Sequence, residues 1–333
     1  MKSSRSQLRP CLKNGLLYVQ RSDGFFVGRR EEGLIFPDTL ASRVIPLLSG
    51  KYSCQEIALL LDQDCADIVE IMDELDRAKL LDHEEPSYSG SENWPELQMI
   101  THRPGVVDGG RKILKARALV RIDIYGCGLI GAGLARILAA SGIGQLGLID
   151  QRNITSQHLP VSTLASVGLN AATELERSLA RDYPKVLDKK IPEPDLVIIT
   201  RTPSPIEILT WMNSSRPHLL VESRGDCVEV GPLVIPGRSS CLRCLTLDRL
   251  DRDPNWYSID LCGQVEYEPP AALAQIAAGL SALAALVQVD AAESVTGLAG
   301  SMGLTDTTLR IDGAMQISAL TRRRHPRCGC SWS

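Results

Sequence analysis

Two short-spaced cysteine pairs give the clearest chemical signal in this sequence. Cys241 and Cys244 enclose two residues, and Cys328 and Cys330 enclose one. Each pair directs two thiolates at one centre, and together the pairs supply the four ligands of a closed, tetrahedral zinc site. A closed site is structural and would pin the C-terminal tail onto its domain. Because C-x-C is a less usual spacing, His325 is an alternative ligand, and reduced thiols without metal are the other interpretation.

A glycine-rich turn forms the second chemical motif. Gly126, Gly128 and Gly131 directly follow the β-rich run 119–125, and a helical pattern comes next. The first glycine permits a tight turn, the second lets phosphate approach the backbone, and the third allows close packing of helix on strand. Free amides at the helix start would bind phosphate. Asp150, at the end of the next β-rich run and about twenty residues further on, would accept hydrogen bonds from ribose. Glycines kept for packing alone are the alternative interpretation.

The elements around this turn predict an α/β domain. Four β-rich runs alternate with helical patterns, at 119–125, 145–149, 195–200 and 218–222. Strands that alternate with helices favour a parallel, doubly wound sheet. We therefore expect a Rossmann-like, nucleotide-binding domain over residues 115–333, which also contains the cysteine pairs.

Residues 1–85 predict a separate, smaller domain. Two short strands flank a turn at 22–24, three helical patterns follow, and Ser53 with Glu56 forms a capping box. This α+β pattern is typical of a winged-helix-like module. Residues 86–114 show little periodicity and are rich in turn-forming residues, so we expect a linker there.

Composition argues against several classes of partner. The 333-residue chain has 36 basic and 40 acidic residues, for a net charge of −4, which gives no global attraction to nucleic acid or anionic membranes. The second helical pattern of the first domain, 54–61, has no Lys or Arg with which to contact DNA phosphates. The most apolar stretch, 271–289, is interrupted by Gln275 and Gln288 and is expected to be a core helix. We expect a cytoplasmic protein whose ten cysteines are thiols or metal ligands.

From about Lys115 to the C-terminus the sequence resembles the ThiF/MoeB superfamily, which includes the ubiquitin-activating enzymes. The resemblance rests on the glycine motif 126–131, on Ser-Gly-Ile-Gly at 141–144 before a strand that ends in Asp150, and on the cysteine pairs, in family order. It implies ATP and Mg²⁺ as cofactors, adenylation of a peptide or protein carboxyl terminus, and a homodimer.

A narrower likeness adds a class of ligand. The segments 231–237, 251–256 and 325–330 look like an actinobacterial branch related to the partner proteins of peptide cyclodehydratases, which install thiazole and oxazole rings in ribosomal peptides. The first domain resembles the PqqD-type element that holds a leader peptide in such systems. The likeness implies a peptide or small protein bound as an added strand at a sheet edge, and a partner enzyme.

Four positions depart from the adenylating pattern of that superfamily. They are Arg152 in place of a second acid, Ser156-Gln157-His158 without an Arg-Gln pair, Asn170-Ala171 in place of a lysine, and Thr200-Arg201-Thr202 in place of an aspartate. Adenylation needs Mg²⁺ ligands and positive charge around the phosphates. We therefore expect a degenerate adenylyltransferase that serves as a peptide-binding scaffold for a modification enzyme.

An active adenylyltransferase with a rearranged site is the alternative function. In that case Arg152 and Arg201, both near the carboxyl end of the sheet, would grip phosphate bidentately as catalytic residues. Ordinary surface arginines are the competing interpretation. Cys262 is a weaker candidate for a thiol that accepts an activated acyl group.

Overall fold

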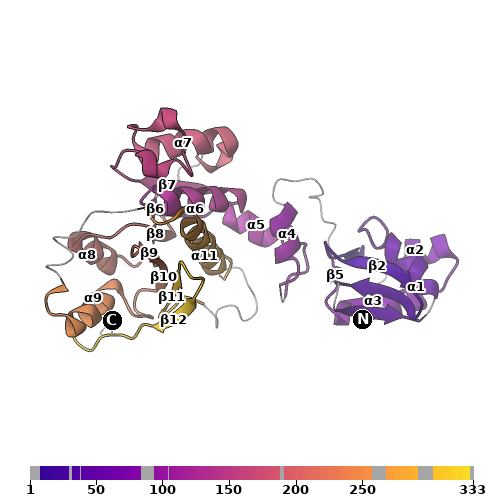
Figure 1. The fold of residues 1–333 in the computed structure, drawn as a ribbon. Coiled ribbons are helices and arrows are strands. Elements are labelled where there is room, and N and C mark those ends of the chain that lie inside the picture. Colours follow the sequence, from indigo (N-terminus) through magenta and orange to yellow (C-terminus); the bar gives the residue numbers. More distant parts are fainter. Residues whose placement is uncertain are drawn as a thin grey trace. The chain divides into compact units, whose positions relative to one another are not determined.

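A computed structural model describes residues 8–29, 32–37, 39–83, 94–103, 105–187, 191–256, 268–291 and 303–330. The chain divides into two compact units, Met1–Lys115 and Ala116–Glu293 with Gly297–Ser333, and each is described by itself (Figure 1).

The first unit packs short helices against a small antiparallel sheet. Its sheets consist of β2 (Leu17–Arg21), β3 (Gly24–Gly28) and β4 (Gly33–Phe36), in that order, and of β1 (Cys11–Leu12) paired with β5 (Leu81–Asp82). Its main helices are α1 (Thr39–Val44), the 3₁₀ helix η2 (Ile45–Leu47), α2 (Cys54–Leu61) and α3 (Cys65–Arg77). The expected hairpin is present as β2 and β3, whereas β4 was not predicted from the sequence.

Local sequence signals explain the helices of the first unit. The capping box predicted at α2 is confirmed, because the Ser53 hydroxyl accepts from the amide of Glu56 and the Glu56 carboxylate accepts from the amide of Ser53. Asp64 is the N-cap of α3, and its side chain accepts a hydrogen bond from the amide of Ala66. The helices bury Ile57 and Leu75 completely in the core of the unit, which supplies its main stabilisation.

The prediction that 86–114 is a linker is wrong in part. Helix α4 (Trp94–Ile100) and most of α5 (Arg111–Arg117) lie within this stretch. Leu97 and Ile100, spaced one turn apart, are fully buried. The Lys13 ammonium donates to the carbonyl oxygen of Thr101 at 2.7 Å, which ties the residues after α4 to the first unit. The short periodic run was obscured by the surrounding Gly, Pro and charged residues.

The second unit is built on one seven-stranded sheet of order β12-β11-β10-β9-β8-β6-β7. Its strands are β6 (Arg121–Tyr125), β7 (Gln145–Ile149), β8 (Leu196–Ile199), β9 (His218–Ser223), β10 (Cys227–Val234), β11 (Thr307–Asp312) and β12 (Ile317–Thr321). The strands β7, β6, β8 and β9 are parallel, as predicted, but β10, β11 and β12 run antiparallel to their neighbours. Only three residues separate β9 from β10, and such a short connection requires an antiparallel pair.

Helices cover both faces of this sheet. One face carries α6 (Leu129–Ala140), α7 (Ala171–Asp182) and α11 (Ala271–Asp290), and the other carries α8 (Pro205–Asn213) and α9 (Leu242–Arg252). Both faces need cover because the strands are apolar on both sides. In β8, Leu196 and Ile198 pack toward α6, α7 and α11, while Val197 and Ile199 pack toward α8 and α9. The expected α/β, doubly wound arrangement is thus present in the parallel half of the sheet.

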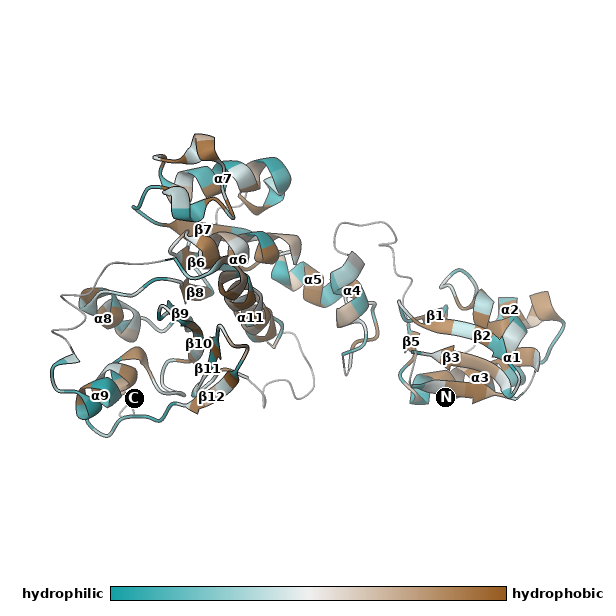
Figure 2. Ribbon diagram, viewed as in Figure 1, coloured by the Kyte–Doolittle hydropathy of each residue, from teal (hydrophilic) through white to brown (hydrophobic). Residues whose placement is uncertain are grey.

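Helix α11 packs closely on α6 and β10. More than half of its buried residues are alanines, which permits a close approach of the α11 and α6 backbones. Figure 2 shows α11 as a largely hydrophobic helix. Among the described residues it is the one helix long and apolar enough to cross a membrane, but half of that stretch is buried inside the unit, as in a core helix. At its end, Asp290 binds Arg117 through two hydrogen bonds of 2.7 and 2.8 Å, and both side chains are fully buried.

Candidate functional site

The glycine turn joins β6 to α6 with the geometry that the motif predicts. Gly126 has a φ of 108°, which side chains rarely adopt. A Cβ at Gly131 would overlap the carbonyl oxygen of Gly126, so the third glycine is required for packing of the helix against the turn. Gly128 is the N-cap of α6 and has no side chain with which to satisfy the first amides of the helix.

A carboxylate of the same chain satisfies these amides. Glu268 accepts a hydrogen bond from the amide of Leu129 at 2.8 Å, and a Cβ at Gly128 would overlap this carboxylate. His158 Nε2 lies 3.3 Å from the other carboxylate oxygen. The side chain of Glu268 is only 13% exposed. Burial opposes its ionisation, but the bonds from His158 and Leu129 outweigh burial and hold the pKa of Glu268 below its ordinary value.

Asp150 lies at the end of β7, where the sequence predicted it, but its oxygens are already bound. One accepts from the amide of Cys127 at 2.7 Å, and the Arg152 guanidinium binds both, with contacts of 3.0 and 2.8 Å. Its side chain is 2% exposed. Burial raises the pKa of Asp150, and the bonds from Arg152 and Cys127 more than offset this, so that the pKa is lowered. In this state Asp150 presents no open oxygen to a ribose.

Arg201, the other arginine considered for phosphate binding, also has a carboxylate partner. Both terminal nitrogens of its guanidinium donate to the carboxylate of Glu207, and the contact from Nη1 is 3.0 Å. Glu207 at the same time completes the capping box of α8 with Ser204. The hydrogen bond from Arg201 lowers the pKa of Glu207 to about 2. Arg152 and Arg201 are therefore half-buried and ion-paired, in contrast to the solvated surface arginines that were the competing interpretation.

The other positions that depart from the adenylating pattern hold loops together. Asn170 caps α7 by accepting from the amide of Thr173, and its side-chain nitrogen donates to the carbonyl oxygen of Asp150. The hydroxyl of Thr200 donates to the carbonyl oxygen of Gly126 at 2.7 Å. Cys262 lies outside the described residues.

The two cysteine pairs meet, as their spacing predicted. The four sulfur atoms of Cys241, Cys244, Cys328 and Cys330 lie within 4.8 Å of one another, with contacts of 3.3 to 3.7 Å between neighbours. Tetrahedral zinc–thiolate bonds of ~2.3 Å place sulfurs about 3.8 Å apart, so the cluster fits a metal ion. His325 lies outside the cluster and bonds to Asp251 at 2.9 Å. The nine described cysteines are all free of disulfides.

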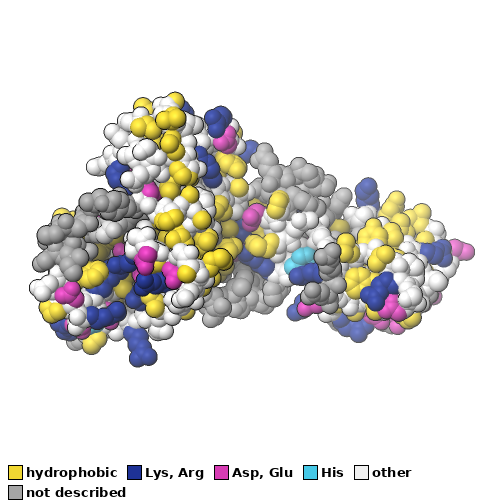
Figure 3. Space-filling view, viewed as in Figure 1, with side chains coloured by type: hydrophobic (Ala, Val, Ile, Leu, Met, Phe, Trp, Pro, Cys, Tyr) yellow, Lys and Arg dark blue, Asp and Glu magenta, His cyan; other side chains and the backbone are white. Residues whose placement is uncertain are grey.

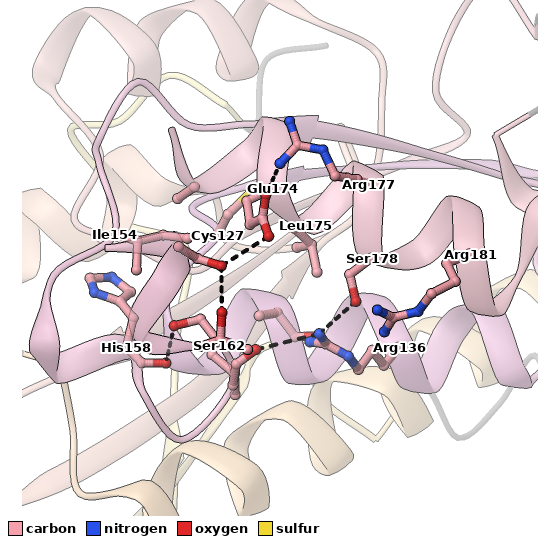
Figure 4. Close-up of a pocket in the computed structure, with 15 residues that line it drawn as sticks. Cys127, Arg136, Ile154, His158, Ser162, Glu174, Leu175, Arg177, Ser178 and Arg181 are labelled. Carbon is pink, nitrogen blue, oxygen red and sulfur yellow. Dashed lines mark hydrogen bonds and ion pairs between the residues drawn. The ribbon is translucent and has the colours of Figure 1, made fainter. Parts of the chain in front are cut away.

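A cavity of about 370 Å³ between α6 and α7, with several arginines in its lining, was not predicted from the sequence (Figure 4). Arg136 of α6 and Arg177, Ser178 and Arg181 of α7 line it, near Cys127 of the glycine turn. The signal was present in the spacing, because positions 174, 177, 178 and 181 share one face of a helix. It was overlooked because mixed charges on a helix are usually a solvated face.

The fold and site define a mixed α/β protein with a glycine turn and a four-cysteine cluster. No protein-family model matches the chain, and no curated protein matches it. Among solved structures it is similar to E. coli MccB with ATP, at 18% identity and a TM-score of 0.67, over 96% of this chain and 99% of that one. A structure of the microcin C7 biosynthetic enzyme MccB with N-formylated MccA gives 17% identity and a TM-score of 0.67, over 97% and 99% of the two chains.

PaaA has the same fold, at 14% identity and a TM-score of 0.67, over 93% of this chain and 99% of PaaA. Identities this low show the fold alone. The chain therefore shares the fold of MccB over nearly its whole length.

Proposed function

We propose that this protein is a ThiF/MoeB-type superfamily member that binds a peptide or small protein as a scaffold for a partner modification enzyme, and that it does not adenylate its ligand. The observation that carries the proposal is the position of Glu268. Its carboxylate occupies the start of α6, the place where a helix of this fold would bind phosphate.

Electrostatics strengthens this argument. An ATP phosphate brought to the amide of Leu129 would meet the ionised carboxylate of Glu268 in a buried setting, where like charges repel strongly. The arginine at 152, where active relatives have a second acid, binds Asp150 and so removes an oxygen ligand that Mg²⁺ would need. The positions that would bind phosphate and Mg²⁺ are thus occupied by side chains of the protein itself.

The active adenylyltransferase remains the second candidate, and one observation favours it. The chain shares its fold over 96% of its length with a protein whose crystal structure contains ATP. For this function, Glu268 would have to leave the start of α6 and Arg152 would have to turn from Asp150 toward the nucleotide.

Strand β2 is the edge at which we propose that the peptide binds. Among the described strands it pairs only with β3, and all five of its residues are exposed. Leu17 and Val19 are 56% and 50% exposed, and Figure 3 shows apolar side chains gathered on the first unit. An open edge with apolar side chains suits addition of an extended strand. This use agrees with the winged-helix-like, PqqD-like interpretation of residues 1–85 and the actinobacterial branch suggested by the sequence.

Further parts of the proposal concern the metal and the assembly. We propose that the four-cysteine cluster holds Zn²⁺, since zinc prefers four thiolates in a closed site. The metal would tie the C-terminal segment to the start of α9 and so stabilise the second unit. A cytoplasmic homodimer, without nucleic acid or membrane partners, is also proposed, from the family resemblance and the composition.

Calorimetric titration of ATP with Mg²⁺ into the zinc-loaded protein tests the proposal. We expect no micromolar binding at the glycine turn. Micromolar binding that Asp150→Ala abolishes would instead support the active adenylyltransferase. Glu268→Ala is expected to bind ATP more tightly than the natural chain, because it frees the amide of Leu129. An equal lack of binding in both proteins would show that Glu268 is not the obstacle.

A further inference from the structure

The cavity between α6 and α7 is lined by charged residues that come from the two helices and not from the glycine turn. Helix α7 presents Glu174, Arg177, Ser178 and Arg181 on one face, at helical spacings of three, four and seven. Helix α6 contributes Arg136 from the opposite wall, as Figure 4 shows. Two helices thus place three arginines around one space, of which Arg136 is half-buried while the side chains of Arg177 and Arg181 are 65% and 76% exposed.

Arg136 has no direct ion pair in the part of the chain that the structure describes. It is half-buried, and Asp182, which pairs directly with Arg181, acts on it at longer range. It donates to the Ser178 hydroxyl at 3.1 Å and to the carbonyl oxygens of Val161 and Ala132 at 3.4 Å each. These acceptors are neutral, and two of the bonds are long. A half-buried cation held this weakly favours an anion in the adjoining cavity.

The rest of the lining does not supply that anion. Glu174 is the one acid among the described residues of the lining, and it is engaged by Arg177 and by the Ser166 hydroxyl at 2.9 Å. Arg181 pairs with Asp182, which lies outside the lining. With Asp182 counted beside its partner Arg181, three arginines face two acids, which leaves one excess positive charge at the cavity.

Hydroxyl groups complete the lining. Ser162, Thr163, Ser166 and Ser178 all border the cavity. Ser162 and Ser166 already donate to His158 and Glu174, whereas the Ser178 hydroxyl accepts from Arg136 and can donate its own proton to a phosphate oxygen. A volume of about 370 Å³ accommodates a phosphate group with a small organic substituent. The remaining walls, such as Ile154 and Leu175, are apolar and would limit competition from water.

We propose that this cavity is a binding site for a phosphate group, held by Arg136 and Ser178 at its base and by Arg177 and Arg181 at its rim. The cavity adjoins the start of α6, because His158 lines it and also contacts Glu268, but Arg136 and Ser178 lie about two turns along their helices from the helix starts. It does not rest on the scaffold function proposed above, because it involves neither Glu268 nor strand β2. The source of the phosphate is either the free inorganic ion or a small phosphorylated metabolite.

The test uses the full chain and inorganic phosphate, titrated at constant ionic strength and followed by isothermal calorimetry and by thermal unfolding. Phosphate is expected to bind and to raise the unfolding temperature. Arg136→Gln, which loses a charge-assisted hydrogen bond, should weaken binding by about tenfold or more. Arg252→Gln is the matched control, because Arg252 pairs with Asp248 on the surface of α9 and should leave the affinity unchanged.

A second readout separates a binding role from a folding role of Arg136. Phenylglyoxal modifies accessible arginines, and mass spectrometry maps the modified positions in the natural chain. Phosphate should protect Arg136 and Arg181 and leave Arg252 reactive. Equal modification with and without phosphate would overturn the proposal, as would phosphate binding that is equally tight in the natural chain and in Arg136→Gln.

Comparison of AMP with inorganic phosphate distinguishes the two sources. Tighter binding of AMP that Arg136→Gln weakens and Asp150→Ala leaves unchanged would assign a phosphorylated metabolite to this cavity. Binding of inorganic phosphate alone, with the same dependence on Arg136, would assign the free ion. Binding of AMP that depends on Asp150 and not on Arg136 would place the phosphate at the glycine turn and refute the cavity site.

Discussion

Removal of Asp290 should be among the most destabilising single substitutions in the second unit. Asp290 and Arg117 are both fully buried, and the guanidinium also donates to the carbonyl oxygen of Ser141 at 3.0 Å. Asp290→Ala would leave the Arg117 charge in the core without its carboxylate. Loss of one partner of such a pair costs roughly 3–5 kcal/mol in the free energy of unfolding.

The assay is urea-induced unfolding followed by tryptophan fluorescence. Trp211 is a suitable probe, because it is buried in the second unit with its ring against Tyr125. Thermal unfolding should show a decrease of about 10 °C, since 1 kcal/mol shifts the midpoint by roughly 2–4 °C in a domain of this size. Arg252→Ala, which breaks an exposed pair, is the control and should cost less than about 1 kcal/mol.

A double substitution distinguishes loss of the ion pair from loss of packing. Arg117→Met combined with Asp290→Leu removes both charges and keeps the volume similar, so it should recover most of the stability lost by Asp290→Ala. If Asp290→Ala cost less than about 1 kcal/mol, the pair would not be desolvated as the structure indicates. If the double variant were as unstable as the single one, packing and not charge would account for the loss.

Four further outcomes are expected. Gly131→Ala should destabilise the second unit or prevent soluble expression, because the new Cβ overlaps a backbone carbonyl; a normal unfolding temperature would contradict this. Cys244→Ser should reduce bound zinc, measured by mass spectrometry, and lower thermal stability together. Since the pKa of Glu268 is lowered in the fold, its ionised form stabilises the protein above the ordinary glutamate pKa, and this stabilisation disappears as the pH falls through the folded-state pKa; Glu268→Gln should flatten the stability profile on the acid side of the ordinary glutamate pKa. Val19→Lys should abolish enrichment of strand-forming peptides from a display library, whereas Leu59→Lys, at an exposed site on α2, should not.

Local patterns allowed much of the second unit to be predicted. The strand, glycine turn, helix and acid between 119 and 150 lie close together in sequence, so their spacing alone determines their arrangement. The cysteine pairs could be predicted to converge for the same reason, because each pair is a local turn and only the meeting of two pairs is long-range. The antiparallel half of the sheet was not predicted, since the pairing that joins it to the rest, β10 with β11, connects strands that are far apart in sequence.

The state of the candidate site could not be predicted from local patterns. Leu129 and Glu268 are 139 positions apart, and nothing near either residue specifies that they meet. The same holds for Arg117 and Asp290, which are 173 positions apart. The sequence identified which residue types depart from the adenylating pattern, whereas the structure shows that Arg152 and Arg201 bind carboxylates and that Asn170 and Thr200 bind backbone groups.

The packing of the glycine turn has a consequence for how such motifs evolve. A side chain at Gly131 would collide with the carbonyl oxygen of Gly126, whether or not a ligand is present. Selection for folding alone would therefore preserve these glycines after a lineage had stopped using nucleotides. Among distant relatives, the glycine motif should therefore not distinguish chains that bind a nucleotide from chains that have lost this function. The residue that faces the first amide of α6 should distinguish them.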